Sequence, residues 1–299
     1  MTGRAGSMNA PWHAGEIAIQ STIGAVERMD EIGRKVIRNY MPDQHRDFFA
    51  QLPFAVFGSV DAEGRPWATL RAGEEGFMHA PDPQRLQLLL PAEHDDPAQA
   101  GLRDGAAVGM LGIELHTRRR NRLNGRLRAL GGEQFEIAVA ESFGNCPKYI
   151  HERDYRFERM PDEPSGLPPR NLPQLDALAR DLIGRSGTFF VATYFVDGEE
   201  MRVDVSHRGG PPGFVQISST GSLLVPDYEG NRFFATLGNI LLNGRAGLVF
   251  PDFESGGLLQ MSGTARVVLD GTERHWEFQP QQLVWREDAL PLRWALLAK

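Results

Sequence analysis

Residues 60–77 read VDAEGRPWATLRAGEEGF, and residues 196–214 read VDGEEMRVDVSHRGGPPGF. After one inserted residue, the two stretches match at Arg65 and Arg202, Thr69 and Ser206, Arg71 and Arg208, Gly73 and Gly210, and Gly76-Phe77 and Gly213-Phe214. Further along, Asn124-Gly125 matches Ser262-Gly263. Arginine, hydroxyl and glycine residues shared at fixed spacing indicate a tandem duplication.

Short β-rich runs separated by Gly, Pro and Asp turns surround both copies. In the first half, the predicted strands are Phe54–Val60, Pro66–Leu70, Leu86–Leu90, Ala107–Gly112, Arg122–Leu130 and Phe135–Val139. In the second half, they are Phe189–Phe195, Arg202–Ser206, Phe214–Ser218, Leu223–Pro226, Ala246–Pro251 and Leu258–Val268.

Helical periodicity precedes the strands of each half. Apolar residues recur every three or four positions from Ile23 to Tyr40, with Ser21 as the expected N-cap, and again from Leu172 to Ile183. The Pro-rich stretch MPDEPSGLPPR, residues 160–170, predicts a linker. We therefore expect a mainly β protein with flanking helices (α+β), divided into a helical segment 1–50, a first β domain 51–160, a linker and helix 161–185, and a second β domain with its tail 186–299.

The composition is that of an ordinary globular protein. Of 299 residues, 41% are hydrophobic and 24% are charged, and 32 Lys and Arg against 39 Asp and Glu give a net charge of −7. An acidic chain is a poor general nucleic-acid binder, so no nucleic-acid partner is expected. One cysteine excludes a disulfide framework, and the eight histidines show no metal-binding spacing, so no metal site is expected. A polar N-terminus and the lack of an apolar run of roughly 20 residues predict a cytoplasmic protein without a membrane partner.

The spacing R-x3-[ST]-x-R-x-G from Arg202 to Gly210 carries the first functional signal. On a strand that continues through Arg208, the side chains of Arg202, Ser206 and Arg208 project to one face. Guanidinium groups make bidentate, charge-assisted bonds to phosphate oxygens. The spacing therefore fits a phosphate site, and a solvated strand face remains the alternative.

A turn and helix from Pro226 carry the second signal. Gly230, Asn231 and Arg232 fall in the turn, where backbone N–H groups and the helix dipole favour an anion. Thr236 and Asn239 add side-chain donors within the helix. Phe214 or Phe233 offers a flat face for a ring system, although core packing explains both equally well.

These residues resemble a known family. RVDVSHRGGPPGFV with DYEGNRFFATLGNILLNGRAGLVF, and in the first half LGIELHTRRRNRLNG and SFGNCPKYI, are similar to the pyridoxamine 5′-phosphate oxidase-like, FMN-binding split-barrel superfamily. The resemblance implies two tandem six-stranded split barrels, an FMN cofactor and oxidoreductase activity. It also implies that Arg202, Ser206, Arg208, Asn231, Arg232, Thr236 and Asn239 bind the cofactor, with no catalytic residue assigned.

Departures from the family pattern limit what the resemblance implies. Ser206 stands where the oxidase commonly has Lys, and its Ser-Arg-Lys signature is missing around residues 234–236, so oxidation of pyridoxine phosphate itself is not expected. Residues 91–105 of the first half are acidic and lack counterparts of Asn231 and Arg232. We expect the second barrel to supply the main phosphate site and the first to supply a cavity wall.

Three functions remain open at this point: an FMN-dependent oxidoreductase of unknown substrate, a flavin-binding module without turnover, and a module for another anionic ligand such as haem or a deazaflavin. The expected partners are a small-molecule substrate and an electron donor, either NAD(P)H or a separate reductase. Two barrels in one chain predict an intrachain pseudo-dimer, and further homodimerisation stays open. The basic run from Arg118 to Arg122 fits a solvated loop, an anion-binding segment or a contact to the partner barrel.

Replacing Arg202 and Asn231 together should abolish flavin retention, because the sequence places both in the phosphate site. The absorbance spectrum of the purified double variant measures this. Full FMN occupancy in that variant would contradict the assignment.

Overall fold

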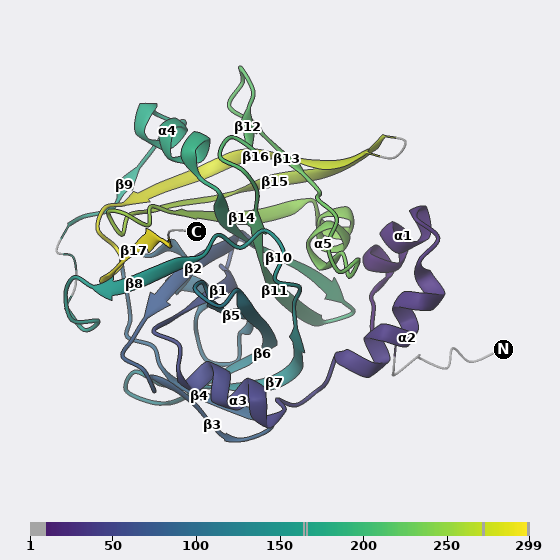
Figure 1. The fold of residues 1–299 in the computed structure, drawn as a ribbon, viewed down its shortest axis with the longest axis horizontal. Coiled ribbons are helices and arrows are strands. Elements are labelled where there is room, and N and C mark those ends of the chain that lie inside the picture. The colour runs from purple at the N-terminus through teal and green to yellow at the C-terminus, as the bar shows by residue number, and fades with distance from the viewer. Residues whose placement is uncertain (1–9, 164, 166, 271–272, 298–299) are drawn as a thin grey trace.

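The computed structural model describes residues 10–163, 165, 167–270 and 273–297, and its elements are shown in Figure 1. The helices are α1 (Ala14–Thr22), α2 (Val26–Val36), α3 (Asp43–Ala50), α4 (Ala177–Arg185) and α5 (Ala235–Asn243), with one 3-10 turn, η1 (Pro97–Gly101). The strands of the first half are β1 (Phe54–Val60), β2 (Pro66–Ala72), β3 (Met78–Asp82), β4 (Arg85–Leu89), β5 (Ala107–Glu114), β6 (Arg119–Gly131), β7 (Gln134–Gly144) and β8 (Arg153–Phe157). Those that follow are β9 (Arg170–Asn171), β10 (Thr188–Asp197), β11 (Glu200–Gly209), β12 (Gln216–Ile217), β13 (Leu223–Pro226), β14 (Arg245–Pro251), β15 (Leu258–Asp270), β16 (Glu273–Arg286) and β17 (Leu292–Leu296).

Two antiparallel sheets have the same topology. The first has the order β2-β1-β5-β6-β7-β4-β3, and the second has β11-β10-β14-β15-β16-β13-β12. Even the irregularities correspond, because the β6–β7 register shifts between Asn124 and Gly125 and the β15–β16 register shifts between Ser262 and Gly263. The predicted mainly β fold of two tandem copies is confirmed. Each of these two strand orders has seven strands, whereas six strands were expected for each split barrel. The short strands β3 and β12 lie at the edges of the two sheets.

The long strand β16 was not predicted. Its Pro280 argued against a central strand, since proline cannot donate to a β ladder. In the structure Pro280 pairs with Gly263 where β16 has one extra residue, Gln281, so the ladder is locally irregular and accepts a proline.

The N-terminal helical segment breaks where one continuous helix was expected. Ser21 lies inside α1, and its Oγ donates to the Ile17 carbonyl at 2.8 Å, so the predicted N-cap at Ser21 is wrong. Gly24 has a φ of 61°, a left-handed conformation that ends the first helix before α2 begins at Val26.

The two barrels pack against each other through β1, β2 and β5 on one side and β10, β11 and β14 on the other. Their contact core includes Val56 and Leu111 from the first barrel and Phe190 and Val205 from the second. Two central glycines allow the sheets to approach. A Cβ on Gly109 would lie 2.9 Å from Asp204 Cα, and one on Gly247 would lie 2.1 Å from the Pro66 carbonyl oxygen.

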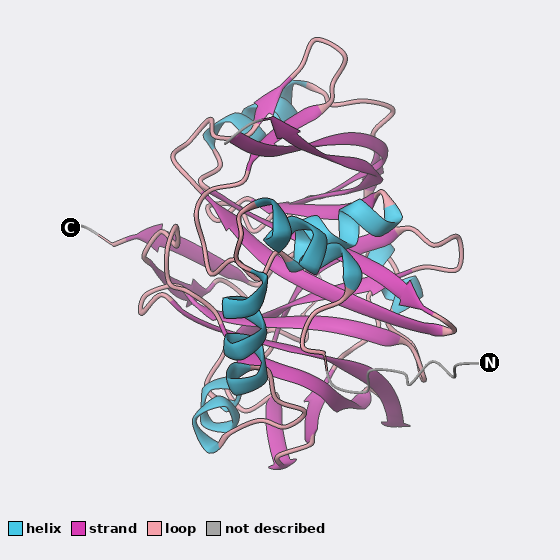
Figure 2. Cartoon of the chain, turned by 90° about the vertical axis from the view of Figure 1, so that its right-hand side faces the viewer, coloured by secondary structure: helices cyan, strands magenta, loops and turns pink. Residues whose placement is uncertain are grey.

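Helices α1 and α2 precede the first barrel in sequence but cover the second. Gly15 of α1 meets Gly238 of α5 so closely that a Cβ on Gly15 would lie 2.2 Å from the Gly238 carbonyl oxygen. Ile19 completes this contact, because it is fully buried in the core of the second barrel. Figure 2 shows these helices together on one face of the molecule.

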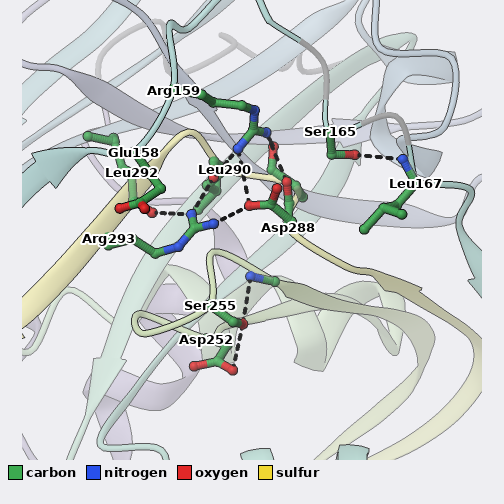
Figure 3. Close-up of polar contacts among 12 residues, drawn as sticks. Glu158, Arg159, Ser165, Leu167, Asp252, Ser255, Asp288, Leu290, Leu292 and Arg293 are labelled. Atoms are coloured by element: carbon green, nitrogen blue, oxygen red, sulfur yellow. Dashed lines mark hydrogen bonds and ion pairs between the residues drawn. The ribbon is translucent and has the colours of Figure 1, made fainter.

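The end of the chain returns to the first half. β17 pairs antiparallel with β8, just before the predicted linker, in which Pro164 and Gly166 lie outside the described residues. Arg159 ties the two segments together: it donates to Asp288 Oδ1 at 3.1 Å and to the Leu290 carbonyl at 2.9 Å, and Arg293 contacts the same carboxylate (Figure 3). Among the described residues, no helix is long and apolar enough to cross a membrane.

The variant Gly15→Ala should lower the free energy of unfolding by about 2 kcal/mol, because the added methyl group has no room against α5. Gly184→Ala is the matched control, since Gly184 is an exposed glycine of α4 with no atom near its Cβ position. We expect that control to be neutral or to stabilise by about 0.5 kcal/mol through helix propensity. Urea unfolding measures both, and equal stability of the two variants would contradict the close helix contact.

Candidate functional site

Strand β11 presents a row of polar side chains on one face. Asp204, Ser206 and Arg208 alternate along it, and the strand continues to Gly209, as the phosphate hypothesis requires. Asp204 and Ser206 are buried at 5% exposure, whereas the side chain of Arg202 is 47% exposed. The inner part of the row therefore lies inside the protein.

Two arginines of the first barrel reach this row from β6. Arg122 donates to Ser206 Oγ at 2.6 Å and pairs with Asp204 Oδ1 at 3.0 Å. Arg120 lies 2.8 Å from His207 Nδ1 and donates to the Cys146 carbonyl. The residues of the basic run therefore have different surroundings. Arg120 and Arg122 reach across the barrel interface, whereas Arg118 pairs with Glu152 near the surface.

Ser206 is the meeting point of three elements. Its Oγ accepts from Arg122 of β6 and from Thr236 Oγ1 of α5 at 3.0 Å, and it donates to Asp204 Oδ2 at 3.1 Å. Both barrels and the helix are therefore held around one hydroxyl group.

Beside this hydroxyl lies a cavity of about 100 Å³. Its lining includes five cationic side chains and three neutral polar ones, namely Arg120, Arg122, Lys148, Arg208, Arg232, Ser206, Asn231 and Thr236. We call it the cationic cavity. Asp227 is an acidic residue in its lining and is already shared by Arg208 at 3.8 Å and Arg274 at 3.1 Å.

The electrostatics of the cavity reflect an excess of positive charge. Burial lowers the pKa of Arg120 to about 10, and neighbouring Arg122 adds to the effect. Burial also lowers the pKa of Arg208, against the opposing effect of Asp227. Burial, Arg120 and Arg208 together hold the pKa of His207 well below 6.5, so its ring is neutral. A bound anion would supply the negative charge that this cluster lacks.

Unpaired donors point to the same conclusion. The Nε atoms of Arg122 and Arg208 are buried and have no hydrogen-bond partner among the described residues. A buried donor without a partner costs about 1–3 kcal/mol. Phosphate oxygens are suitable acceptors for such groups.

The turn before α5 has an unusual backbone. Arg232 and Phe234 have φ values of 62° and 63°, in the left-handed region that costs non-glycine residues energy. Asn231 Oδ1 accepts from the Phe233 amide at 3.2 Å and holds the turn. The start of α5, from Phe234 to Thr236, lines the cavity. The N–H groups in the first turn of a helix have no partner within the helix, so they are available to a ligand there.

Aromatic rings border the cationic cavity. Tyr149 and Tyr228 are stacked with centroids 5.3 Å apart, and Phe214 lies 6.3 Å from Tyr228. Phe214 and Phe233 both line the cavity and are both 7% exposed. They therefore contribute to packing and to the cavity wall at once.

The predicted cofactor residues fall into two groups. Ser206, Arg208, Asn231, Arg232 and Thr236 line the cationic cavity. Arg202 and Asn239 line a second cavity of about 990 Å³ that is covered by the N-terminal helices. We call this the helix-covered cavity, and its lining also includes Trp12, Glu16, Glu141 and Asp204.

The sequence left Arg120 and Arg122 open, as part of a basic run that fits an anion-binding segment or a contact to the partner barrel, and it did not single out Lys148. Strand alternation within the run HTRRRNR places Arg120 and Arg122 on one face, which was an available signal. The barrel that this face contacts is decided only by the packing of the two halves.

In the first barrel the equivalent position is occupied by the protein's own carboxylates. Thr69 and Arg71 correspond to Ser206 and Arg208, and Gln260 of β15 corresponds to Arg122 of β6. Asp96 is buried among them, 2.6 Å from Thr69 Oγ1, 3.0 Å from Arg71 Nη2 and 2.8 Å from Gln260 Nε2. Its carboxylate takes hydrogen bonds of the kind that a bound anion would accept.

Glu93 completes this neutralisation. It bridges Arg71 and Arg286, each at 2.5 Å, and Arg286 also lies 3.4 Å from Asp96. Two arginines thus face two carboxylates, and the first barrel has no excess positive charge here. Among the described residues, no group of three or more His, Cys, Asp or Glu is placed to hold a metal ion.

Comparisons with known proteins found a family model that matches part of the chain and several similar solved structures. The family model described as pyridoxamine 5′-phosphate oxidase matches residues 41–174. Similar solved structures include a putative pyridoxamine 5′-phosphate oxidase from Lactobacillus delbrueckii, which is 17% identical over 36% of this chain and 95% of its own, with a TM-score of 0.29. An FAD-binding protein from Mycobacterium smegmatis is 17% identical over 38% of this chain and 95% of its own, with a TM-score of 0.27. The haem storage protein HutZ from Vibrio cholerae is 14% identical over 38% of this chain and 95% of its own, with a TM-score of 0.28. A search of the curated proteins found no match.

Asp96→Asn should lower the free energy of unfolding by about 3 kcal/mol near neutral pH, because it leaves two buried arginines short of negative charge. Burial alone would raise the pKa of Asp96, but Arg71 and Arg286 hold it below 3.8. A carboxylate with a lowered pKa stabilises the folded state above its unfolded pKa, so the difference between wild type and variant should shrink as the pH falls below about 4. Urea unfolding across pH tests this, with the exposed neighbour Asp95→Asn as control; equal stability of the two variants would refute the paired site.

Proposed function

We propose that the chain belongs to the pyridoxamine 5′-phosphate oxidase-like superfamily, whose family model matches residues 41–174, and that it is a flavoprotein that binds FMN non-covalently and acts as an oxidoreductase. The observation that carries the proposal is the cationic cavity. Arginines of both barrels line it, Arg122 of the first barrel donates to Ser206 of the second, and the buried Nε atoms of Arg122 and Arg208 have no hydrogen-bond partner among the described residues.

The residues of the cavity fit a phosphate monoester. Arg122 and Arg208 offer buried guanidinium groups, Ser206 and Thr236 offer hydroxyl groups, and the start of α5 offers backbone N–H groups. Arg120 adds a further positive charge from the first barrel. The chain would thus fix the phosphate end of the cofactor between its two halves.

Flavin, when bound, supplies the hydride and electron chemistry. The task of the protein is then to orient the ring system and to exclude water around it. Phe214, Phe233 and the stacked pair Tyr149–Tyr228 provide aromatic surface beside the phosphate-binding groups. Reducing equivalents would come from NAD(P)H, a separate reductase or the substrate.

A single cofactor per chain follows from the asymmetry of the two barrels. Glu93 and Asp96 neutralise the arginines of the first barrel. The corresponding arginine of the second barrel, Arg208, lies 3.8 Å from Asp227, and Asp227 also pairs with Arg274. The two barrels would act as an intrachain pseudo-dimer with one cofactor at their contact.

The visible spectrum of the purified chain separates the proposed function from its alternatives. Flavin bands support it, whereas a Soret band would indicate haem. Bleaching of the flavin bands by NADH or NADPH, with recovery in air, would distinguish an enzyme from a module that only binds flavin.

Arg208→Gln should weaken FMN binding by about ten- to a hundredfold, because one charge-assisted contact to phosphate is worth about 1.5–3 kcal/mol. Flavin fluorescence quenching during a titration measures the dissociation constant. Arg274→Gln is the matched control, since Arg274 also pairs with Asp227 but is not part of the cavity lining. An equal loss in both variants, or no loss in Arg208→Gln, would argue against phosphate binding at this cavity.

A further inference from the structure

The lining of the helix-covered cavity includes four carboxyl groups, of which Asp197 is exposed and three lie farther in. Glu16 comes from α1, Glu141 from β7 and Asp204 from β11, so the N-terminal segment and both barrels each contribute one of the inner three. Asp204 is paired with Arg122 at 3.0 Å, while Glu141 lies 3.9 Å from the half-exposed Arg202 and is also under the influence of Arg122. The inner end of the cavity is therefore rich in acceptors.

Two amide oxygens in the same lining have room for a further donor. Asn239 is 2% exposed, its Nδ2 donates to Thr193 Oγ1 at 3.0 Å, and its buried Oδ1 lies toward His13; burial lowers the pKa of His13, and the side-chain interaction with Asn239 opposes this. Asn124 donates to Glu141 Oε2 at 3.2 Å, and its Oδ1 is buried without a hydrogen bond among the described residues. Buried acceptors left open in a cavity call for a donor from a ligand.

Aromatic rings form the apolar part of the wall. Trp12 and Phe233 have centroids 4.8 Å apart, Phe143 lies 5.8 Å from Phe233, and Phe195 packs against His13 at 4.0 Å. Such rings favour an organic cation with an apolar body over a hydrated inorganic ion, because they bury apolar surface and attract positive charge through their faces.

We propose that the helix-covered cavity binds an organic ammonium ion with an apolar body, at a site distinct from the cationic cavity. The ammonium group donates to Asn124 Oδ1, Asn239 Oδ1 and the carboxylate of Glu141, and the apolar body packs on the aromatic wall. This site shares Phe233 with the cationic cavity but takes its polar groups from other residues, and it does not require a bound flavin.

Four basic residues also belong to the cavity lining, namely Arg34, Lys35, Arg38 and Arg202. Lys35 is exposed, Arg34 is exposed and paired with Asp30 at 2.8 Å, Arg202 is 47% exposed, and Arg38 is half-buried. Charges in contact with water are screened, whereas the carboxyl groups inside act at short range in a less polar environment.

Protonation couples to binding in a defined direction. Burial raises the pKa of Glu16 well above 4.5, with Glu141 and Asp204 adding to the effect and His13 and Arg122 opposing it. Burial also raises the pKa of Glu141, with Asp204 acting the same way and Asn124, Arg202 and Arg122 opposing it. His13 is uncharged, because burial lowers its pKa to about 4. An incoming cation favours the ionised carboxylates, so binding should release protons and tighten as pH rises.

Isothermal titration of the full chain with benzylamine tests the proposal, with benzyl alcohol and benzoate as the neutral and anionic counterparts. We expect benzylamine alone to bind, with affinity rising from about pH 5 to about pH 8 as the carboxyl groups ionise. Glu141→Gln should weaken binding about tenfold, and Arg202→Gln should strengthen it about threefold by removing the nearby cation.

Glu200→Gln is the matched control, because Glu200 also contacts Arg202, at 3.5 Å, but is not part of the cavity lining. Equal binding of benzyl alcohol, no binding of benzylamine, or equal effects of Glu141→Gln and Glu200→Gln would overturn the proposal. FMN titration of the same variants is read separately, so a failure of flavin binding leaves the result for the amine site intact.

Discussion

Close approach of the two barrels at Gly109 and Gly247 is the constraint on which the rest of the structure depends. Each glycine lies on the central strand of one barrel, β5 or β14, and abuts the backbone of the other barrel at Asp204 or Pro66. A side chain at either position would push the sheets apart, since packed interiors have little room to adjust. The same contact brings Arg120 and Arg122 of β6 beside Ser206 of β11, so the cationic cavity exists only because the barrels touch here.

Duplication followed by divergence explains why one fold carries two different charge patterns. Corresponding strands provide Thr69 and Arg71 in one copy and Ser206 and Arg208 in the other. The first copy places Glu93 and Asp96 against its arginine, while the second places a helix start there. Burying an arginine requires a counter-charge, and the two copies differ in whether the protein itself or a ligand provides it.

Much of the fold was predictable because strand and turn patterns are local. Twelve of the strands were placed from alternation and Gly or Pro turns, and the repeated R-x3-[ST]-x-R-x-G spacing indicated the duplication. β16 was missed, because its Pro280 is tolerated only where the register with β15 shifts, which is a property of the pair of strands. The Ser21 cap failed because α1 begins at Ala14 with His13 as its N-cap, and Ser21 lies in its last turn.

The residue types of the site are readable from the chain, since Arg, Ser and Thr at strand and helix spacing are suited to bind phosphate. Which of these residues meet depends on the packing of the two barrels. It separated Arg202 and Asn239 from Arg208 and Thr236, and it added Arg120 and Arg122 from the other barrel. Local spacing decides on which side of a strand a residue lies, whereas the neighbour across an interface depends on how two sheets pack.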